Sequence, residues 1–485
     1  MDNRLLKLEE VSLSFGPIIL LPSVSFSLDK GQHMVIEGPS GSGKTLLAKI
    51  IAGIYPPTAG DIICTFQKSE VAYVAPQPWV DTQPDRTYFE SRYEVFYGGN
   101  EVVDIAHSAH ENTLVDDQKF RDFLQKMGMS YLLEKQARQL SNGESKTLQL
   151  ASVFSQKSIK CYLLDKPFLG LDEAKRRNLT DYIHALSVEK TFISIGDNLF
   201  RDHVDHKIIR LPKEKQDLHH FDKNLLHREI VRRYASISHD YDVIVGMENV
   251  DVYYDELCIL NGINWKVLQG EKWLVKGTNG SGKSMLMSLI TADNPKAYNQ
   301  NIVLFDHARG SGESIWDIKA KIGYVSPEAH MYFLKKENVH LKKILQFSDT
   351  LNDRFSSKIS CGEVVESGLY ERMDYSGGYI SKNTRDFMAC FGMDHLMNER
   401  YAYLSMGIQR ILLLMRAMIK NPALLIFDEP CQGLDDEQKN LFLEAVSLIC
   451  AQENSTVIYI SHHLDEIPDN INKQLLLENK RAYIV

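Results

Sequence analysis

The sequence lacks long hydrophobic runs and any feature of a secretory leader. No window approaches roughly eighteen uninterrupted apolar residues, the length that a membrane-spanning helix needs. The first residues, MDNR, are not a basic segment followed by an apolar stretch, so no signal peptide is expected. If the protein serves membrane transport, a second polypeptide must supply the pore.

Cysteine is scarce, and its distribution argues against two kinds of site. The cysteines are odd in number, scattered and without a CxxC pair, so neither a disulfide framework nor a zinc site is indicated. We interpret them as small buried hydrophobic residues of a cytoplasmic protein. They are Cys64, Cys161, Cys258, Cys361, Cys390, Cys431 and Cys450.

Positive charge is also in short supply. The formal net charge is −9, from 55 Lys and Arg against 64 Asp and Glu. Nucleic-acid binding usually needs a broad basic surface, so we find no strong nucleic-acid signal. With 485 residues, the chain exceeds the size at which a single core stops growing, and two or three domains are expected.

What the sequence does contain is an internal repeat. Residues 38–45, GPSGSGKT, recur as GTNGSGKS at 277–284. Farther along, LSNGE at 140–144 recurs as LSMGI at 404–408, and each copy then has an apolar run that ends in Asp. Because order and approximate spacing are kept, we infer a duplicated domain, with copies at 1–212 and 245–485.

Residues 213–244 between the copies are predicted to be a charged, partly helical linker. Arg228, Arg232 and Arg233 form its basic cluster. A solvated helix face is the expected explanation of such a charge run, and contact with an anionic partner is the alternative.

The coarse pattern predicts an α/β fold. Short apolar runs at 34–36, 273–275 and 424–427 are bounded by Gly or charge and indicate buried strands. Periodic stretches at 45–52 and 284–291 indicate helices. Strand, glycine-rich turn and helix in succession are typical of a mainly parallel sheet in each copy.

Each GxxxxGK[ST] segment lies between a predicted strand and a predicted helix, the context that supports a phosphate-binding loop. Its glycines let successive N–H groups point inward, and the helix N-terminus adds positive potential. Both lysines are expected to reach the β- and γ-phosphates of ATP. The predicted loop residues are Gly38, Pro39, Ser40, Gly41, Ser42, Gly43, Lys44 and Thr45, and then Gly277, Thr278, Asn279, Gly280, Ser281, Gly282, Lys283 and Ser284.

A magnesium ion is expected beside each triphosphate. Thr45 and Ser284 offer hydroxyl ligands, and the carboxylates that end the apolar runs, Asp165 and Asp428, would hold the ion through water. ATP and Mg²⁺ are therefore the predicted cofactors.

Together these motifs resemble the ATP-binding-cassette superfamily over nearly the whole chain. The resemblance implies two nucleotide-binding domains, each with a mainly parallel sheet core and a helical subdomain. It also implies an intramolecular head-to-tail pairing, in which each ATP lies between the phosphate loop of one cassette and the signature loop of the other. The implied signature residues are Ser141, Gly143, Ser405 and Gly407.

The same resemblance assigns four further residues. Phe15 and Tyr254 match the adenine-stacking aromatic, although the pattern alone fits a core residue equally well. Gln77 stands at the position of the glutamine loop, a metal contact, and Glu328 stands there in the second copy. The negative charge of Glu328 near the γ-phosphate departs from the family pattern.

The two copies differ in the residues that activate water. In the family, a Glu after the strand-ending Asp polarises the water, assisted by a His one strand later. The second copy has Glu429 and His462, with His463 as a weaker candidate. The first has Lys166 and Asp197, and a protonated lysine cannot accept a proton as a carboxylate does. We predict hydrolysis mainly at the second phosphate loop.

A narrower resemblance is to the tandem-cassette family named for molybdenum transport and also described as photorepair proteins. Residues 309–319, RGSGESIWDIK, and 322–326, IGYVS, carry this match. The residues themselves indicate no special role for that stretch beyond a loop and helix that lead into a strand.

The sequence leaves open which of three processes ATP hydrolysis drives. One is an ATPase that partners a membrane permease at the cytoplasmic face of the inner membrane, linked to molybdate by resemblance. The others are a non-transport cassette ATPase acting on ribosomes or DNA, and a tandem ATPase for monosaccharide import. The second copy is longer around residues 330–400, which fits either a partner-docking surface or an inert insertion.

Overall fold

A computed structural model of the chain divides into two compact units. The described residues up to 212 form the first unit, and those from 223 onward form the second. In the described part of the chain, no helix is long and apolar enough to cross a membrane. The described residues are 4–15, 18–39, 41–76, 116–134, 142–197, 199–200, 206–212, 223–235, 240–254, 257–278, 280–326, 359–371, 378–401, 404–432, 434, 436–461 and 463–485.

The first unit is built on a parallel sheet of short, mostly apolar strands. Its strands alternate side chains between two cores, so that Tyr162 and Leu164 join one core while Cys161 and Leu163 join the other. Burial on both faces explains why such strands are apolar runs in the sequence. In sheet order they are β5 (Val71–Val74), β6 (Cys161–Asp165), β7 (Thr191–Ile195), β3 (His33–Glu37) and β8 (His206–Arg210).

Helices cover one face of this sheet, and a helix with an antiparallel sheet covers the other. The first face packs on α4 (Asp117–Lys126), η2 (Ser130–Glu134), α5 (Asn142–Phe154) and α6 (Glu173–Ser187). The second packs on α1 (Lys44–Ile51) and on β2 (Ile18–Asp29), β1 (Arg4–Phe15) and β4 (Ala59–Cys64), and η1 (Lys68–Glu70) precedes β5.

The second unit repeats this plan and adds one antiparallel edge strand. Ile426 and Ile458 face one core, whereas Leu425 and Phe427 face the other. Its main sheet has the order β14 (Ile322–Val325), β15 (Leu424–Asp428), β16 (Val457–Ile460), β11 (Lys272–Gly277), β17 (Lys473–Glu478) and β18 (Arg481–Ile484), with β18 antiparallel. The smaller sheet has the order β10 (Leu257–Leu268), β9 (Val243–Tyr254), β12 (Ile302–Leu304) and β13 (His307–Ala308).

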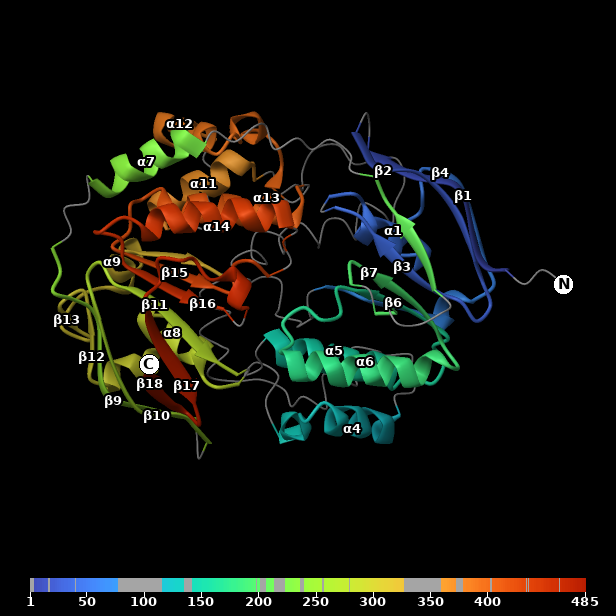
Figure 1. Ribbon diagram of the computed structural model, residues 1–485, viewed down its shortest axis with the longest axis horizontal. Coiled ribbons are helices and arrows are strands. Elements are labelled where there is room, and N and C mark those ends of the chain that lie inside the picture. Colours follow the sequence, from blue (N-terminus) through green and yellow to red (C-terminus); the bar gives the residue numbers. More distant parts are fainter. Residues whose placement is uncertain are drawn as a thin grey trace. The chain divides into compact units, whose positions relative to one another are not determined.

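Within this unit, α13 and α14 lie on one side of β15 and β16, and the smaller sheet lies on the other (Figure 1). The smaller sheet shares its core with α8 (Lys283–Ile290), η4 (Pro295–Asn299) and α9 (Ile315–Ala320). The opposite core contains α11 (Cys361–Tyr370), α12 (Lys382–Cys390), α13 (Met406–Met418) and α14 (Asp436–Cys450). The short turns η5 (Asp394–Leu396) and η7 (Leu464–Glu466) complete the unit.

The α/β class with mainly parallel sheets is confirmed in both units. The predicted strands lie within β3, β11 and β15, and the two predicted helices are α1 and α8, each shifted by one residue. The interpretation of cysteines as buried hydrophobic residues is confirmed for most of them. The buried ones are Cys161, Cys361, Cys390, Cys431 and Cys450.

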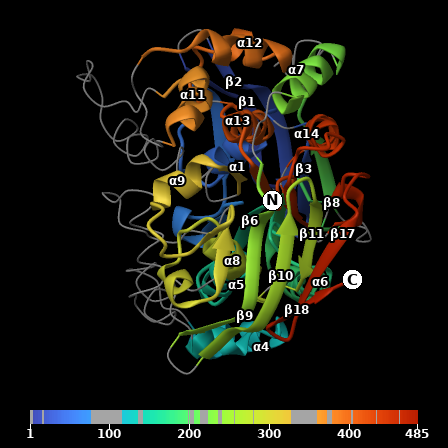
Figure 2. The ribbon, with the colours of Figure 1, turned by 90° about the vertical axis from the view of Figure 1, so that its left-hand side faces the viewer.

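The expectation of a solvated helix face in the linker holds for Arg228 and Arg232, which are exposed, and is wrong for Arg233. The segment contains α7 (Lys223–Ala235), as the pattern predicts, but this helix is part of the second unit and lies beside α12 (Figures 1 and 2). Leu226, Ile230 and Tyr234 enter that unit's core, and Arg233 is buried rather than solvated. Arg233 is buried because it lies on the same side of α7 as these apolar residues, which pack into the core.

Candidate nucleotide-binding sites

Each phosphate-loop segment joins a central strand to a helix, β3 to α1 and β11 to α8. The first glycine of each loop has no room for a side chain. A Cβ on Gly38 would lie 2.8 Å from the carbonyl oxygen of Leu211, and one on Gly277 would lie 2.6 Å from that of Leu477. Because both neighbours are backbone atoms of the adjacent strand region, only glycine lets the loop turn here.

The loop lysines fold back over their own loops. Lys44 Nζ donates to the carbonyl oxygens of Gly38 (2.6 Å) and Pro39 (2.5 Å). Lys283 Nζ donates to those of Gly277 (2.7 Å) and Thr278 (3.0 Å). Each ammonium group therefore lies over its own loop, where it would contact a triphosphate bound to the loop.

The strand-ending carboxylates accept hydrogen bonds from hydroxyl groups, and in the first unit one of these hydroxyls belongs to the end of the phosphate-loop segment. Thr45 Oγ1 donates to Asp165 Oδ2 (2.6 Å), and the Tyr73 hydroxyl donates to the same oxygen (3.1 Å). In the second unit the Tyr324 hydroxyl donates to Asp428 Oδ2 (3.3 Å). Burial raises the pKa of Asp165, and the hydrogen bonds from Thr45 and Tyr73 partly oppose this.

The donor set fits a hard divalent cation. Among the described residues, Asp165 Oδ1 and the hydroxyls of Ser42 and Ser281 are buried without a hydrogen-bond partner. A carboxylate oxygen beside a threonine hydroxyl suits Mg²⁺, which prefers oxygen ligands and keeps several of its waters. Thr45 and Asp165 would hold the ion in the first unit, and Ser284, which is exposed, would join Asp428 in the second.

Comparison with known proteins gives a family for this arrangement. The family described as ABC transporter matches residues 21–169 and 260–432, which include both phosphate loops. The ABC transporter ATP-binding protein ModF of Escherichia coli (strain K12) is 27% identical over 489 residues, covering 96% of this chain and 94% of ModF. An uncharacterized ABC transporter ATP-binding protein of Schizosaccharomyces pombe is 26% identical over 494 residues, covering 96% of each chain.

The chain belongs to the ABC transporter family. It is a tandem ATP-binding protein with ATPase activity, and its two units are ABC cassettes.

The residue after the strand-ending aspartate has the same unusual backbone in both cassettes. Lys166 has φ 45° and Glu429 has φ 42°, both in the left-handed region. The Lys166 N–H donates to Ile195 O and the Glu429 N–H donates to Ile460 O, each at 3.0 Å. The two side chains therefore leave equivalent positions of the fold, and only their chemistry differs.

The residues that follow the neighbouring strand differ between the cassettes. Asp197 follows β7 near Lys166, and burial raises the pKa of Asp197 while the Lys166 charge lowers it. In the second cassette the corresponding strand, β16, is followed by Ser461 and by His463, which is exposed. His462 itself lies outside the described residues.

The signature segments open the helices α5 and α13. Gly143 and Gly407 are buried, and Gln438 Nε2 of α14 donates to Ser405 Oγ (3.3 Å). A Cβ on Gly407 would lie 1.8 Å from Gln438 Oε1, so Gln438 packs directly on this glycine.

Several predicted site residues fall outside the described residues or have undescribed side chains. Those outside are Ser40, Gln77, Ser141, Asn279, Glu328 and His462. Phe15 and Tyr254 end β1 and β9, but their side chains are not described.

Sequence reasoning missed a buried cation on each signature helix. Lys146 Nζ donates to the carbonyl oxygens of Ala75 and Pro76 (3.3 Å for Pro76), directly after β5. Burial lowers the pKa of Lys146 to about 7, and Asp165 and Asp197 oppose this. Burial likewise lowers the pKa of Arg410 to about 10. Both follow the signature glycine by three residues, a repeat that could have identified them.

Proposed function

We propose that this tandem ATPase binds two MgATP and hydrolyses ATP mainly at its second phosphate loop, to energise transport through a separate permease. In the head-to-tail pairing that is typical of the family, the two cassettes of one chain would pair with each other. Ser405 and Gly407 would then complete the first site, and Ser141 and Gly143 would complete the second. The first site would hold ATP as a clamp while the second turns it over.

One observation carries the proposed division of labour. Glu429 and Lys166 occupy equivalent left-handed positions with the same backbone hydrogen bond. A carboxylate there can accept a proton from the attacking water, whereas an ammonium group can only stabilise phosphate charge. The roles of His462, Gln77 and Glu328 are part of the proposal and follow from the family pattern.

The test compares matched changes at the two positions. Glu429→Gln is expected to lower steady-state ATP hydrolysis by roughly 10²- to 10⁴-fold, the usual loss when a general base is removed. Lys166→Gln should leave turnover within about threefold, because that site contributes little to hydrolysis. Two tightly bound ATP per Glu429→Gln chain should be recovered after gel filtration. Equal losses in the two variants would contradict the proposal.

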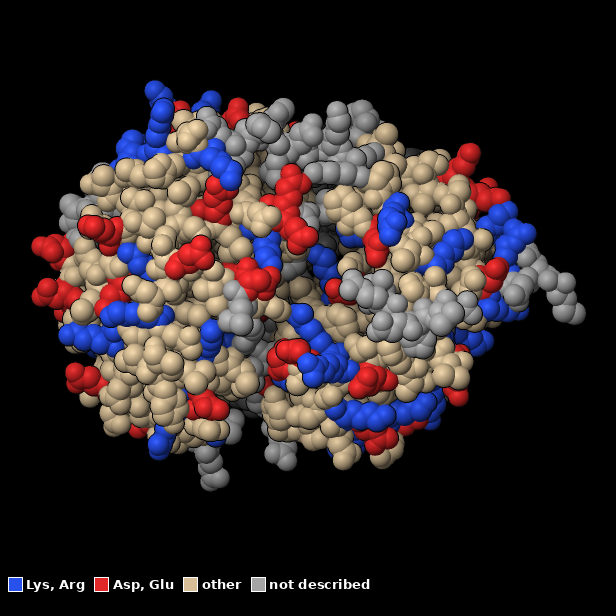
Figure 3. Space-filling model, viewed as in Figure 1, with Lys and Arg blue, Asp and Glu red and all other residues tan. Residues whose placement is uncertain are grey.

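The transport role rests on similarity to an E. coli protein named ModF, and on charge. On the face shown in Figure 3, Lys and Arg side chains are interspersed with Asp and Glu rather than gathered in one basic tract. This distribution favours a protein partner over a nucleic acid. We therefore propose a molybdate-linked permease at the cytoplasmic membrane face as the partner.

Affinity purification from membrane and soluble fractions, followed by mass spectrometry, tests the partner. A permease recovered from the membrane fraction supports the proposal. Ribosomal proteins or DNA-repair proteins recovered instead would replace it with the non-transport alternative.

A further inference from the structure

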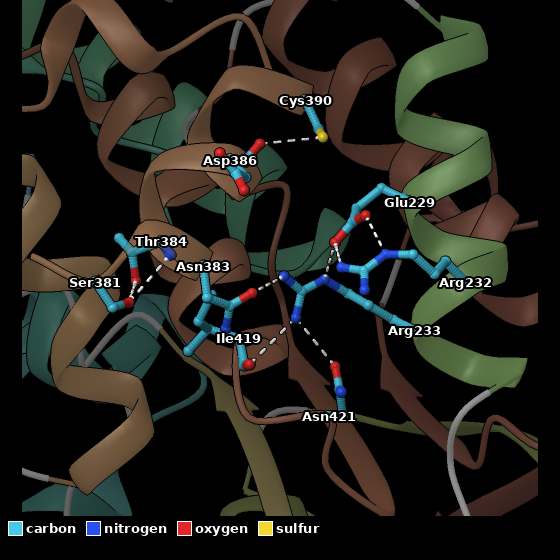
Figure 4. Close-up of polar contacts among 10 residues, drawn as sticks. All are labelled: Glu229, Arg232, Arg233, Ser381, Asn383, Thr384, Asp386, Cys390, Ile419 and Asn421. Carbon is cyan, nitrogen blue, oxygen red and sulfur yellow. Dashed lines mark hydrogen bonds and ion pairs between the residues drawn. The ribbon is translucent and has the colours of Figure 1, made fainter.

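Helix α7 places one buried arginine between the start of α12 and the residues that follow α13. Arg233 is 3% exposed, although it belongs to the segment between the two cassettes. Figure 4 shows its guanidinium group pointing from α7 toward α12 and toward the residues that follow α13. A buried guanidinium is stable only when its donors are matched by acceptors, so these contacts define its role.

The acceptors come from several elements. Arg233 Nη1 donates to Ile419 O (3.2 Å) and Asn421 Oδ1 (3.1 Å), and Nη2 donates to Asn383 Oδ1 (2.8 Å). Its Nε pairs with Glu229 Oε1 at 2.7 Å, and the group lies 4.0 Å from the centre of the Phe387 ring. Burial lowers the pKa of Arg233, and the Glu229 charge opposes this, so the charge is kept.

Two of these acceptors mark the end of the signature helix. Ile419 and Asn421 follow α13 directly, and Asn421 has the left-handed backbone (φ 52°) that suits asparagine after a helix. The other end of α13 begins after Ser405. The helix is only about 20 Å long, so a shift of its last turn displaces the signature residues at its start.

The same connector also touches the helix that holds Ser405. Lys223 Nζ of α7 pairs with Glu444 Oε1 of α14 at 2.9 Å. Gln438 of α14 donates to Ser405 Oγ and packs on Gly407. Thus α7 contacts both helices that fix the second signature loop.

We propose that Arg233 is a positioning residue for the second signature loop. This inference rests on the proposed function, in which Ser405 and Gly407 contact the ATP held by the first phosphate loop. By holding the end of α13, helix α7 of the second cassette sets how long the first site retains ATP. Arg233 touches neither nucleotide nor metal, and acts through α13.

If Arg233 only stabilised the fold, removal of any one of its partners would have a similar effect on ATP release. The chain offers a matched pair that separates the two roles, because Asn421 ties Arg233 to α13 whereas Asn383 ties it to α12. Asn421→Gly removes the side chain but keeps the left-handed backbone, and Asn383→Ala removes the other acceptor. Arg232→Ala is a control on the same helix, since Arg232 is exposed and also pairs with Glu229.

The measurement is release of radiolabelled ATP from the full chain in a Glu429→Gln background, where turnover is blocked. The release phase that disappears in Lys44→Ala is the one from the first site. Asn421→Gly should speed this phase by about tenfold, since hydrogen bonds to charged groups contribute on that scale. Asn383→Ala and Arg232→Ala should change it less than twofold, and the second-site phase should not move.

Equal acceleration by Asn421→Gly and Asn383→Ala, or none by either, would overturn the inference. Thermal unfolding must show that both variants remain folded at the assay temperature. Arg233→Met, which keeps the packing volume, must reproduce the Asn421→Gly effect. A Lys44→Ala protein that keeps both release phases would instead refute the proposed first site, and with it the basis of this inference.

Discussion

The two cassettes have the same backbone conformation after the strand-ending aspartate and differ in the side chain at that position. Lys166 and Glu429 share a left-handed backbone that costs about 1–3 kcal/mol for a residue other than glycine. The first cassette retains this strained turn although its side chain cannot act as a base. The turn is therefore held by the fold around it, including the backbone hydrogen bond to the next strand, and the two cassettes differ in the side chain that it carries.

The largest expected contrast is at the metal-side carboxylates. Asp428→Asn should lower ATP hydrolysis by about 10²-fold or more, because it would weaken Mg²⁺ binding at the site proposed to activate water. Asp165→Asn should lower it by less than about fivefold, since the proposed clamp site does not turn over. Steady-state hydrolysis at saturating MgATP measures both. A larger loss in Asp165→Asn would reverse the assignment of the two sites.

A second prediction concerns a variant in which the first cassette carries the same residues as the second at two positions where they differ. In a Glu429→Gln chain, Lys166→Glu combined with Asp197→His gives the first cassette the pair of residues proposed to activate water in the second. Because the backbone at 166 already matches that at 429, activity should rise about tenfold above the Glu429→Gln background. Lys166→Glu alone is the control and should recover less. If the double change recovers nothing, the first cassette lacks more than these two side chains.

A third prediction concerns the crowded signature of the second cassette. Gly407→Ala places a methyl group where Gln438 Oε1 now lies, and should lower the free energy of unfolding by about 1–3 kcal/mol through overpacking. Adding Gln438→Ala makes room and should restore about half of the loss. Urea denaturation of the four proteins gives the values, and additive losses would show that the two residues do not compete for space.

The smallest predicted effect compares buried lysines. Burial lowers the pKa of Lys420 to about 8, with Glu371 opposing, and lowers that of Lys146 to about 7, against an ordinary value of 10.5. Between the folded pKa and 10.5 the unfolded chain binds more protons, so each lysine's contribution to stability rises as pH rises.

This gain should be about 1 kcal/mol between pH 8 and pH 9 for Lys420, and should begin one pH unit lower for Lys146. It is measured as the pH dependence of the difference in unfolding free energy between wild type and Lys420→Met or Lys146→Met. A difference that stays flat across this range would mean that these lysines keep their ordinary pKa.

Local sequence pattern was enough to predict much of this protein. Glycine-rich turns, apolar strands and the helices after them depend on neighbours close in the chain, so α1, α8, β3, β11 and β15 follow from residues within a few positions. The duplication doubled this signal, because every motif had a second copy in register. The exchange of Glu429 for Lys166 was visible for the same reason.

Only the tertiary structure decided which charged residues of the predicted linker are buried and which distant residues contact the candidate sites. Arg233 belongs to a basic cluster typical of a solvated face, but its acceptors lie about 150 to 190 residues away in the chain. Gln438 reaches Ser405 from another helix, and Lys146 reaches strand β5 across 71 residues. A one-dimensional pattern shows which residues repeat, whereas burial and partners are set by elements that meet only once the chain has folded.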